Sequence, residues 1–129
     1  MKNVPRQLDW VDKRAACTIA AVFNQLCDGI LADVEAFNLA AKIDTFQANL
    51  LSSGTTMVVG NPTRIPRVVV RVGIVDNRIE VQSDLEKSFW RVNIGLNDEG
   101  RCILRLEGGS EMEQWQFRKK ALEGLFFGD

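Results

Sequence analysis

Arginines and one phenylalanine in the second half of this 129-residue chain could bind phosphate groups. Arginine carries a planar fork of N–H donors that matches phosphate geometry, and an aromatic ring can stack on a nucleic-acid base. In the strands predicted below, these side chains project from one face of the sheet, here called the outer sheet face: Arg67, Arg71, Arg78, Phe89, Arg91 and Arg105. This pattern indicates a candidate surface for nucleic acid, a phosphorylated ligand or another partner.

Acidic residues on the same face favour a less specialised interpretation. Glu80 and Glu107 lie among the arginines, and residues 61–107 carry seven arginines and one lysine against seven acidic residues. A nucleic-acid footprint is usually more one-sided, whereas opposite charges on neighbouring strands form ion pairs. We therefore prefer a solvated face with cross-strand ion pairs, and keep nucleic-acid binding as the alternative.

Asp33 is the one charged residue on an otherwise apolar side of a predicted helix, the side that carries Ile30 and Phe37. A carboxylate in that position needs an arginine, a backbone amide or an opening to solvent, because burying an unpaired charge is costly. Two interpretations stay open. Asp33 is either a paired structural residue or the carboxylate of a pocket between helix and sheet.

The composition removes much of the usual catalytic equipment. The chain has no histidine and no tyrosine, and its formal net charge is only −1. The commonest general base and the commonest neutral metal ligand are therefore absent. The sequence also lacks a phosphate-binding loop, a dinucleotide-binding glycine motif and a nucleophile elbow. We predict no catalytic residue, no cofactor and no metal site.

The three cysteines, Cys17, Cys27 and Cys102, are odd in number and form no C-x-x-C pair. This pattern predicts buried free thiols in a reducing compartment rather than a disulfide framework. No stretch approaches the roughly 20 apolar residues that a membrane span requires. The sequence therefore predicts a soluble, cytoplasmic protein that has no membrane segment.

Residues 9–51 lack proline and contain a single glycine, Gly29, which predicts a long amphipathic helix. Its apolar stripe is coherent over 11–41 and then moves around the helix to a second line: Leu39, Ile43, Phe46 and Leu50. The helix therefore bends or breaks at 42–45 or at Gly29, or it continues as one rod of roughly 63 Å. Such a rod would overhang a core of this size, so a second copy of the chain would have to cover its free apolar surface.

The second half of the chain predicts an antiparallel sheet built from hairpins. Strands over 65–75 and 78–83 alternate apolar and polar residues, and Asp76–Asn77 suits a two-residue turn between them. That turn places Ile74 opposite Ile79, so that the apolar residues of both strands share one face.

A second hairpin follows the same logic around residues 98–100. Gly100 suits the left-handed position of a three-residue turn, which places Leu96 opposite Cys102. Residues 55–59 can add an edge strand.

The C-terminal segment is ambiguous. Ser110 and Glu113 match a capping box, which predicts a helix over 111–122. A strand stays the alternative because these residues also alternate: Glu113, Trp115 and Phe117. The apolar end at 125–127 must either cap the core or dock on a partner.

Together these elements predict one α+β domain over 1–129. The long N-terminal helix packs on a four- to five-stranded antiparallel sheet, and a short helix ends the chain. We expect a non-enzymatic interaction or assembly module that forms a homodimer. Two alternatives stay open: binding of nucleic acid or a phosphorylated ligand on the outer sheet face, and a small-ligand pocket or enzyme site near Asp33.

Overall fold

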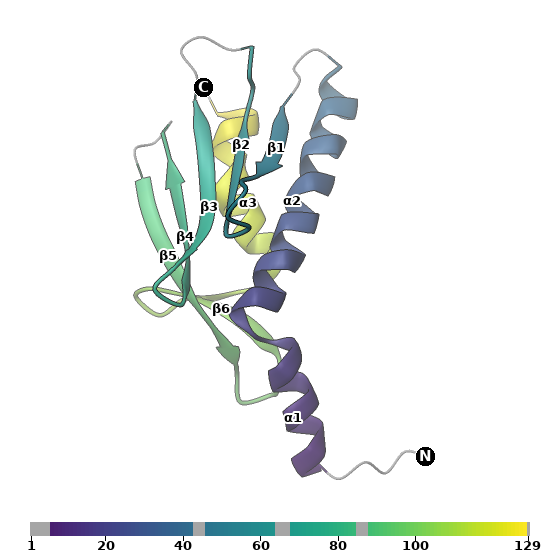
Figure 1. Ribbon diagram of the computed structural model, residues 1–129, viewed down its shortest axis with the longest axis vertical. Coiled ribbons are helices and arrows are strands. Elements are labelled where there is room, and N and C mark those ends of the chain that lie inside the picture. The colour runs from purple at the N-terminus through teal and green to yellow at the C-terminus, as the bar shows by residue number, and fades with distance from the viewer. Residues whose placement is uncertain (1–5, 43–45, 64–67, 85–87, 129) are drawn as a thin grey trace.

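The structure is a computed structural model that describes residues 6–42, 46–63, 68–84 and 88–128. It has the predicted α+β architecture, with three helices and a single antiparallel sheet (Figure 1). The helices are α1 (Arg6–Ala16), α2 (Ile19–Ala41) and α3 (Gln114–Phe127). The sheet has seven strands, more than the four or five expected, and they lie in chain order: β1 (Gln47–Leu50), β2 (Thr56–Gly60), β3 (Val69–Val75), β4 (Arg78–Ser83), β5 (Ser88–Leu96), β6 (Cys102–Leu106) and β7 (Glu111–Met112).

The N-terminal helical segment breaks at Cys17 and Thr18, where no break was expected. Thr18 adopts an extended conformation, and its side-chain oxygen accepts a hydrogen bond from the Ala21 amide at 3.2 Å. A threonine N-cap of this kind starts a new helix, and α1 and α2 consequently meet at an angle of 56°. Within the described part of the chain, no single helix combines the length and apolar composition of a membrane span, although α1 and α2 taken together as a bent pair do.

Of the alternatives for the long N-terminal helix, the break at 42–45 is the one that the structure supports, because α2 ends at Ala41. The helix that was expected beyond this point is wrong. Lys42 adopts a left-handed conformation with φ 61° and its amide donates to the Asn38 carbonyl, which ends α2. The Asn38 side chain then pairs with the Phe46 backbone, donating to its carbonyl and accepting from its amide, both at 2.9 Å. These two bonds act like one rung of a sheet, and β1 begins at the next residue. Gly29, the other candidate break, lies inside α2.

The β3–β4 hairpin confirms the predicted register. Ile74 lies opposite Ile79, and Asp76 and Asn77 both have positive φ, at 51° and 62°. Positive φ at both central residues is the conformation that a type I′ turn requires. The predicted first residues of this strand, 65–67, lie outside the described part of the chain.

The second hairpin is also confirmed, and three more strands extend the sheet. Leu96 lies opposite Cys102, and Gly100 has φ +78° in the turn. β2 corresponds to the expected strand over 55–59, but it lies between β1 and β3 rather than at the edge. The edges are β1 and the two-residue β7. β1 was not predicted as a strand, whereas β7 lies in the segment for which the sequence left helix and strand open.

α2 and α3 lie side by side over one face of the sheet (Figure 1). The strands turn every second side chain toward the helices, and these apolar side chains are buried: Met57, Val59, Val70, Val72, Ile79, Val81, Val92 and Leu104. The helices contribute the other half of the core: Phe23, Leu26, Ile30 and Phe117. Burial of each large apolar side chain contributes about 1.5–3 kcal/mol to folding.

The C-terminal helix begins three residues later than predicted. Residues 111–112 pair with β6 as β7, and Glu113 rather than Ser110 is the N-cap of α3. The reciprocal partner is Gln116, whose side-chain oxygen accepts from the Glu113 amide at 2.8 Å. The helix continues to Phe127, and its apolar end is divided: Leu125 is buried in the core, while Phe127 is 70% exposed. Docking of this end on a partner stays a prediction.

The prediction of three free thiols is wrong, because Cys17 and Cys102 form a disulfide with their Cα atoms 5.5 Å apart. The bond joins the break between α1 and α2 to the first residue of β6. The two cysteines are 85 residues apart in the sequence. The residues next to each cysteine in the sequence do not indicate that the fold brings the two together. Cys27 is the free, buried cysteine.

Candidate functional site

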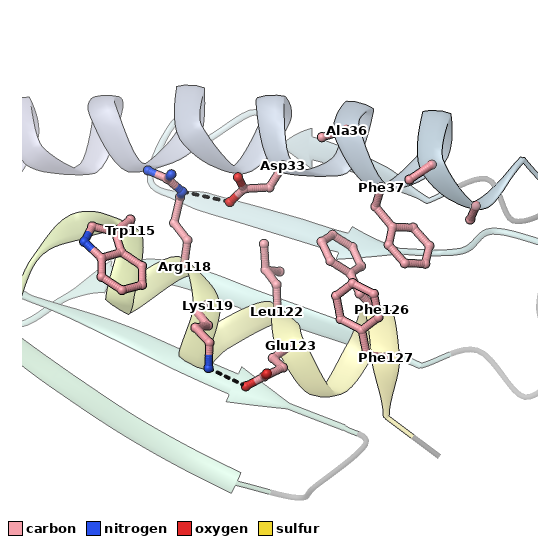
Figure 2. A pocket seen from close by; sticks show the side chains of 12 residues that line it. Asp33, Ala36, Phe37, Trp115, Arg118, Lys119, Leu122, Glu123, Phe126 and Phe127 are labelled. Carbon is pink, nitrogen blue, oxygen red and sulfur yellow. Dashed lines mark hydrogen bonds and ion pairs between the residues drawn. The ribbon is translucent and has the colours of Figure 1, made fainter.

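A groove of about 700 Å³ opens between α2 and α3 on the side away from the sheet (Figure 2). We call it the helix groove. Its residues come from the last three turns of α2 and from most of α3: Asp33, Ala36, Phe37, Ala40, Ala41, Trp115, Arg118, Lys119, Leu122, Glu123, Phe126 and Phe127. Volumes of 300–1,000 Å³ are typical of binding sites, so the helix groove is the candidate functional site.

One end of the helix groove is aromatic. Phe37 of α2 stacks on Phe126 of α3, with ring centroids 4.7 Å apart, and it meets Phe127 edge-on at 5.3 Å. Ala36 and Ala40 line the α2 wall beside these rings. Their short side chains leave the space open, because a larger residue on the same turn of the helix would fill it.

The other end of the helix groove contains an ion pair between the two helices. The Nε of Arg118 donates to Asp33 Oδ2 at 2.8 Å, and both side chains are partly buried. Asp33 therefore has the arginine partner that its position on an apolar helix side requires, and it also lines a groove. This groove lies between two helices, whereas the expected pocket lay between helix and sheet.

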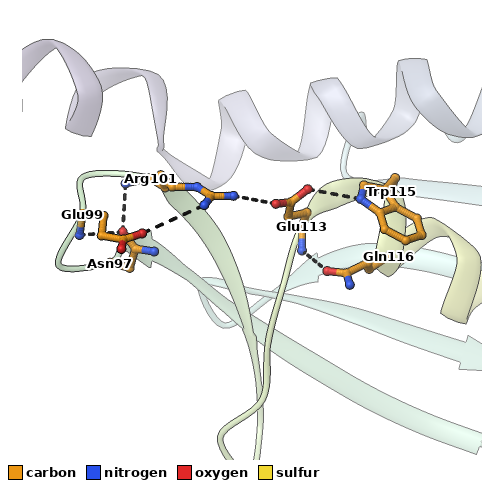
Figure 3. A network of polar contacts seen from close by, with 6 residues as sticks. All are labelled: Asn97, Glu99, Arg101, Glu113, Trp115 and Gln116. Carbon is orange, nitrogen blue, oxygen red and sulfur yellow. Dashed lines mark hydrogen bonds and ion pairs between the residues drawn. The ribbon is translucent and has the colours of Figure 1, made fainter.

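The exposed rim of the helix groove holds Trp115 in a fixed orientation. The indole N–H of Trp115 donates to Glu113 Oε1 at 3.1 Å, and the other oxygen of Glu113 accepts from Arg101 at 2.6 Å (Figure 3). Arg101 is in turn positioned by Asn97, whose side chain accepts from its amide at 3.0 Å. An aromatic side chain that is 54% exposed is thus held at the rim by a chain of hydrogen bonds from the β5–β6 turn.

The arginines of the outer sheet face are paired with carboxylates. Arg71 contacts Asp84 at 3.4 Å, Arg78 contacts Glu107 at 3.2 Å, and Arg105 contacts Glu111 at 2.6 Å. Arg67 lies outside the described residues. The pairs are solvent-exposed to different degrees, and exposed pairs of this kind contribute little to stability.

Arg91 lies at the centre of the outer sheet face, between two carboxylates. It is 3.7 Å from Glu80 and 3.5 Å from Glu107, and its guanidinium lies 5.0 Å from the centre of the Phe89 ring. The structure thus brings arginines and the aromatic residue together as the sequence analysis expected. It also places an acidic residue beside each described arginine, so a phosphate group would have to compete with these carboxylates.

The side chains of the helix groove offer mainly apolar contact. Its two carboxylates and two cations are engaged as ion pairs, Asp33 with Arg118 and Lys119 with Glu123 at 3.1 Å. Among the described residues, no group of three or more cysteine and acidic side chains could hold a metal ion.

Asp33 was identified from the sequence, and 125–127 was noted as an apolar end, but the other groove residues of α3 were not predicted: Trp115, Arg118, Lys119, Leu122 and Glu123. The predicted helix over 111–122 did not extend to Phe126 and Phe127. Because its predicted start was three residues too early, the side of the helix that carries Trp115 could not be assigned. The apolar end at 125–127 was the one signal of this site. No protein-family model, curated protein or solved structure matches this chain.

Proposed function

We propose that this protein is a non-enzymatic interaction module that assembles as a homodimer through the helix groove. One observation carries the proposal: the groove is apolar and open, and large apolar side chains surround it in contact with water. Trp115 is 54% exposed and Phe127 70%, and both line the groove. Exposed apolar surface of this kind is characteristic of protein–protein interaction sites.

A second copy of the chain is the simplest occupant. In a two-fold dimer the same surface of each copy forms both sides of the interface. The helix groove can therefore be covered without a second kind of protein. The helix does not form the overhanging rod of roughly 63 Å that was expected. α2 has 23 residues and is about 35 Å long, and it lies over the sheet. The proposal therefore depends on the groove and its rim alone.

Sedimentation equilibrium at micromolar concentrations tests the proposal. We expect a concentration-dependent dimer, and we expect Trp115→Ser to weaken it at least tenfold because Trp115 is a fixed aromatic side chain at the rim. Phe89→Ser on the outer sheet face is the matched control, since Phe89 is also about half exposed and should leave the dimer unchanged. A monomer over the whole concentration range would rule the proposal out.

A small apolar ligand in the same groove is the second candidate, which the groove volume favours. A ligand of this kind would raise the melting temperature of the protein across a metabolite panel. Trp115→Ser should abolish that rise, whereas Phe89→Ser should not.

Binding of nucleic acid or phosphorylated ligands on the outer sheet face is less favoured, because the described arginines there have carboxylate neighbours. A gel-shift series at two salt concentrations tests it. Affinity that falls steeply with salt and weakens in Arg71→Ala would support this alternative over the homodimer.

The disulfide changes the expected compartment. The cytoplasmic expectation rested on three free thiols, but Cys17 and Cys102 are bonded to each other. Structural disulfides persist mainly in oxidising environments, so we propose that the protein functions in one. Counting free thiols in protein taken directly from its source tests this: one thiol per chain supports the proposal, and three contradict it.

A further inference from the structure

We infer that the two copies of the homodimer pair across the helix groove with α2 of one copy against α3 of the other. In this arrangement the two-fold axis runs along the groove, and each groove is covered by the opposite helix pair. The inference rests on the proposed homodimer and specifies its geometry.

The two helices that border the groove carry opposite charge. α2 contains three acidic residues and no lysine or arginine: Asp28, Asp33 and Glu35. α3 contains three basic residues and one acidic residue: Arg118, Lys119, Lys120 and Glu123. Pairing α2 with α2 would bring like charges together, whereas pairing α2 with α3 brings opposite charges together.

The charges on α2 that are not paired within the chain are also negative. Asp33 and Arg118 pair with each other within the chain. Asp28 and Glu35 are exposed and make no hydrogen bond or ion pair with the described residues. α2 therefore presents two unpaired negative charges to solvent.

Lys119 is the cation that α3 presents at the groove. Lys120 points toward the sheet, with its ammonium 5.1 Å from the centre of the Trp90 ring. Lys119 lines the groove, and its one ion-pair partner among the described residues is Glu123, one turn along the same helix, in an exposed pair. Exposed pairs of this type are weak, so Lys119 can exchange its partner for a carboxylate of a second copy.

The levels of these charges along the groove also match. α2 and α3 run in the same direction, since Gln25 contacts Gln114 near the start of the groove and Phe37 contacts Phe126 near its end. A two-fold rotation about an axis along the groove preserves these levels. Arg118 contacts Asp33, so the neighbouring Lys119 lies at about the height of Asp33 along the groove axis. After the two-fold rotation, Lys119 of one copy therefore faces the part of the other copy's α2 that lies between Asp28 and Glu35.

The α2 surface permits close approach of another helix. Ala32, Ala36 and Ala40 are all exposed and form one line at a spacing of four residues. These side chains let a facing helix come near enough for Lys119 to reach an α2 carboxylate. The exposed Phe127 lies at the end of the groove beside Phe37, level with Ala40.

A charge-reversal cycle measured by sedimentation equilibrium tests the arrangement. Glu35→Lys and Lys119→Glu should each raise the dimer dissociation constant about tenfold, and the double variant should return within about threefold of the wild-type value. Asp98→Lys, a reversal at another exposed position, on the β5–β6 turn, is the matched control and should leave the constant unchanged. Circular dichroism and the melting temperature establish that each variant is folded.

The outcomes separate this inference from the proposed function. A wild-type monomer overturns the homodimer and, with it, this geometry. If the wild type is a dimer but the dissociation constant of the double variant is raised by the product of the two single effects, the α2–α3 pairing is overturned and the homodimer stands. Recovery in the double variant supports the pairing, because only a direct contact between the two positions restores affinity.

Discussion

Arg118 of α3 crosses α2 directly over Gly29. A Cβ atom on Gly29 would lie 2.8 Å from Arg118 Cδ and would also overlap its guanidinium group. This close approach lets Arg118 reach Asp33, one turn further along α2, at 2.8 Å. It explains why a glycine occurs in the middle of a helix that it does not break: the absence of a side chain allows the interhelical ion pair at the groove.

The first prediction is that Gly29→Ala destabilises the protein. Alanine should gain about 1 kcal/mol from helix propensity alone. The new methyl group, however, must displace Arg118 and disturb its bond with Asp33, which costs about 1.5–3 kcal/mol. We therefore expect a net loss of about 1 kcal/mol in the free energy of unfolding, measured with urea.

An Arg118→Ala background reverses the expected sign of that change. With the arginine side chain removed, Gly29→Ala should stabilise the protein by about 0.5–1 kcal/mol. Stabilisation in both backgrounds would show that Arg118 does not press on Gly29.

The second prediction concerns Asn38, whose side chain makes both hydrogen bonds to the Phe46 backbone. Asn38→Ala leaves both backbone groups without their partner and should lower the free energy of unfolding by about 2 kcal/mol. Asn38→Asp keeps the acceptor for the Phe46 amide but places a carboxylate near the Phe46 carbonyl, so it should also destabilise. Asn49→Ala is the control, because Asn49 is exposed on β1 and should change stability by less than about 0.5 kcal/mol. Equal stability of Asn38→Ala and wild type would contradict the role of this clamp.

The elements that the sequence predicts correctly are those that local chemistry determines. The turns at Asp76–Asn77 and Gly100 require specific backbone conformations, and each turn sets the register of its two strands. The end of α2 could be located because the apolar stripe shifts there. The strand after it could not, because it depends on the Asn38 bonds to a residue eight positions away.

The candidate site shows the same division. Asp33 could be found because a single carboxylate on an apolar helix side needs an explanation. Its partner Arg118 is 85 residues away, and the start of α3 was misplaced by three residues, so the facing helix side was unknown. The Cys17–Cys102 bond was missed for a similar reason: proximity across 85 residues depends on the packing of the whole domain.

The third prediction is that the Cys17–Cys102 disulfide contributes strongly to stability. It closes a loop of about 85 residues that contains α2 and β1 to β5. Loss of such a cross-link should cost about 4–5 kcal/mol by the chain-entropy estimate. Urea unfolding of the Cys17→Ala/Cys102→Ala variant measures the loss. Alkylation of denatured, unreduced protein should add one label per chain, and reduction beforehand should add three. Three labels without reductant would show that the bond does not form.

The last prediction concerns the thiol of Cys27. Burial raises its pKa from the ordinary 9.0 to about 11, and the negative charge of Asp28 adds to the effect. The thiol of the unfolded chain therefore loses its proton at a lower pH than the thiol of the folded chain.

Linkage then gives the sign of the pH dependence. The contribution of Cys27 to stability is fully present below pH 9 and should be lost progressively as the pH rises from about 9 through about 11. The measurement is the free energy of unfolding as a function of pH for wild type and for Cys27→Ala, which removes this titration and leaves every other group in place. The free energy of unfolding of the wild type minus that of Cys27→Ala should fall as the pH rises across that range. A difference that stays constant from pH 8 to 11 would show that Cys27 titrates normally in the folded chain.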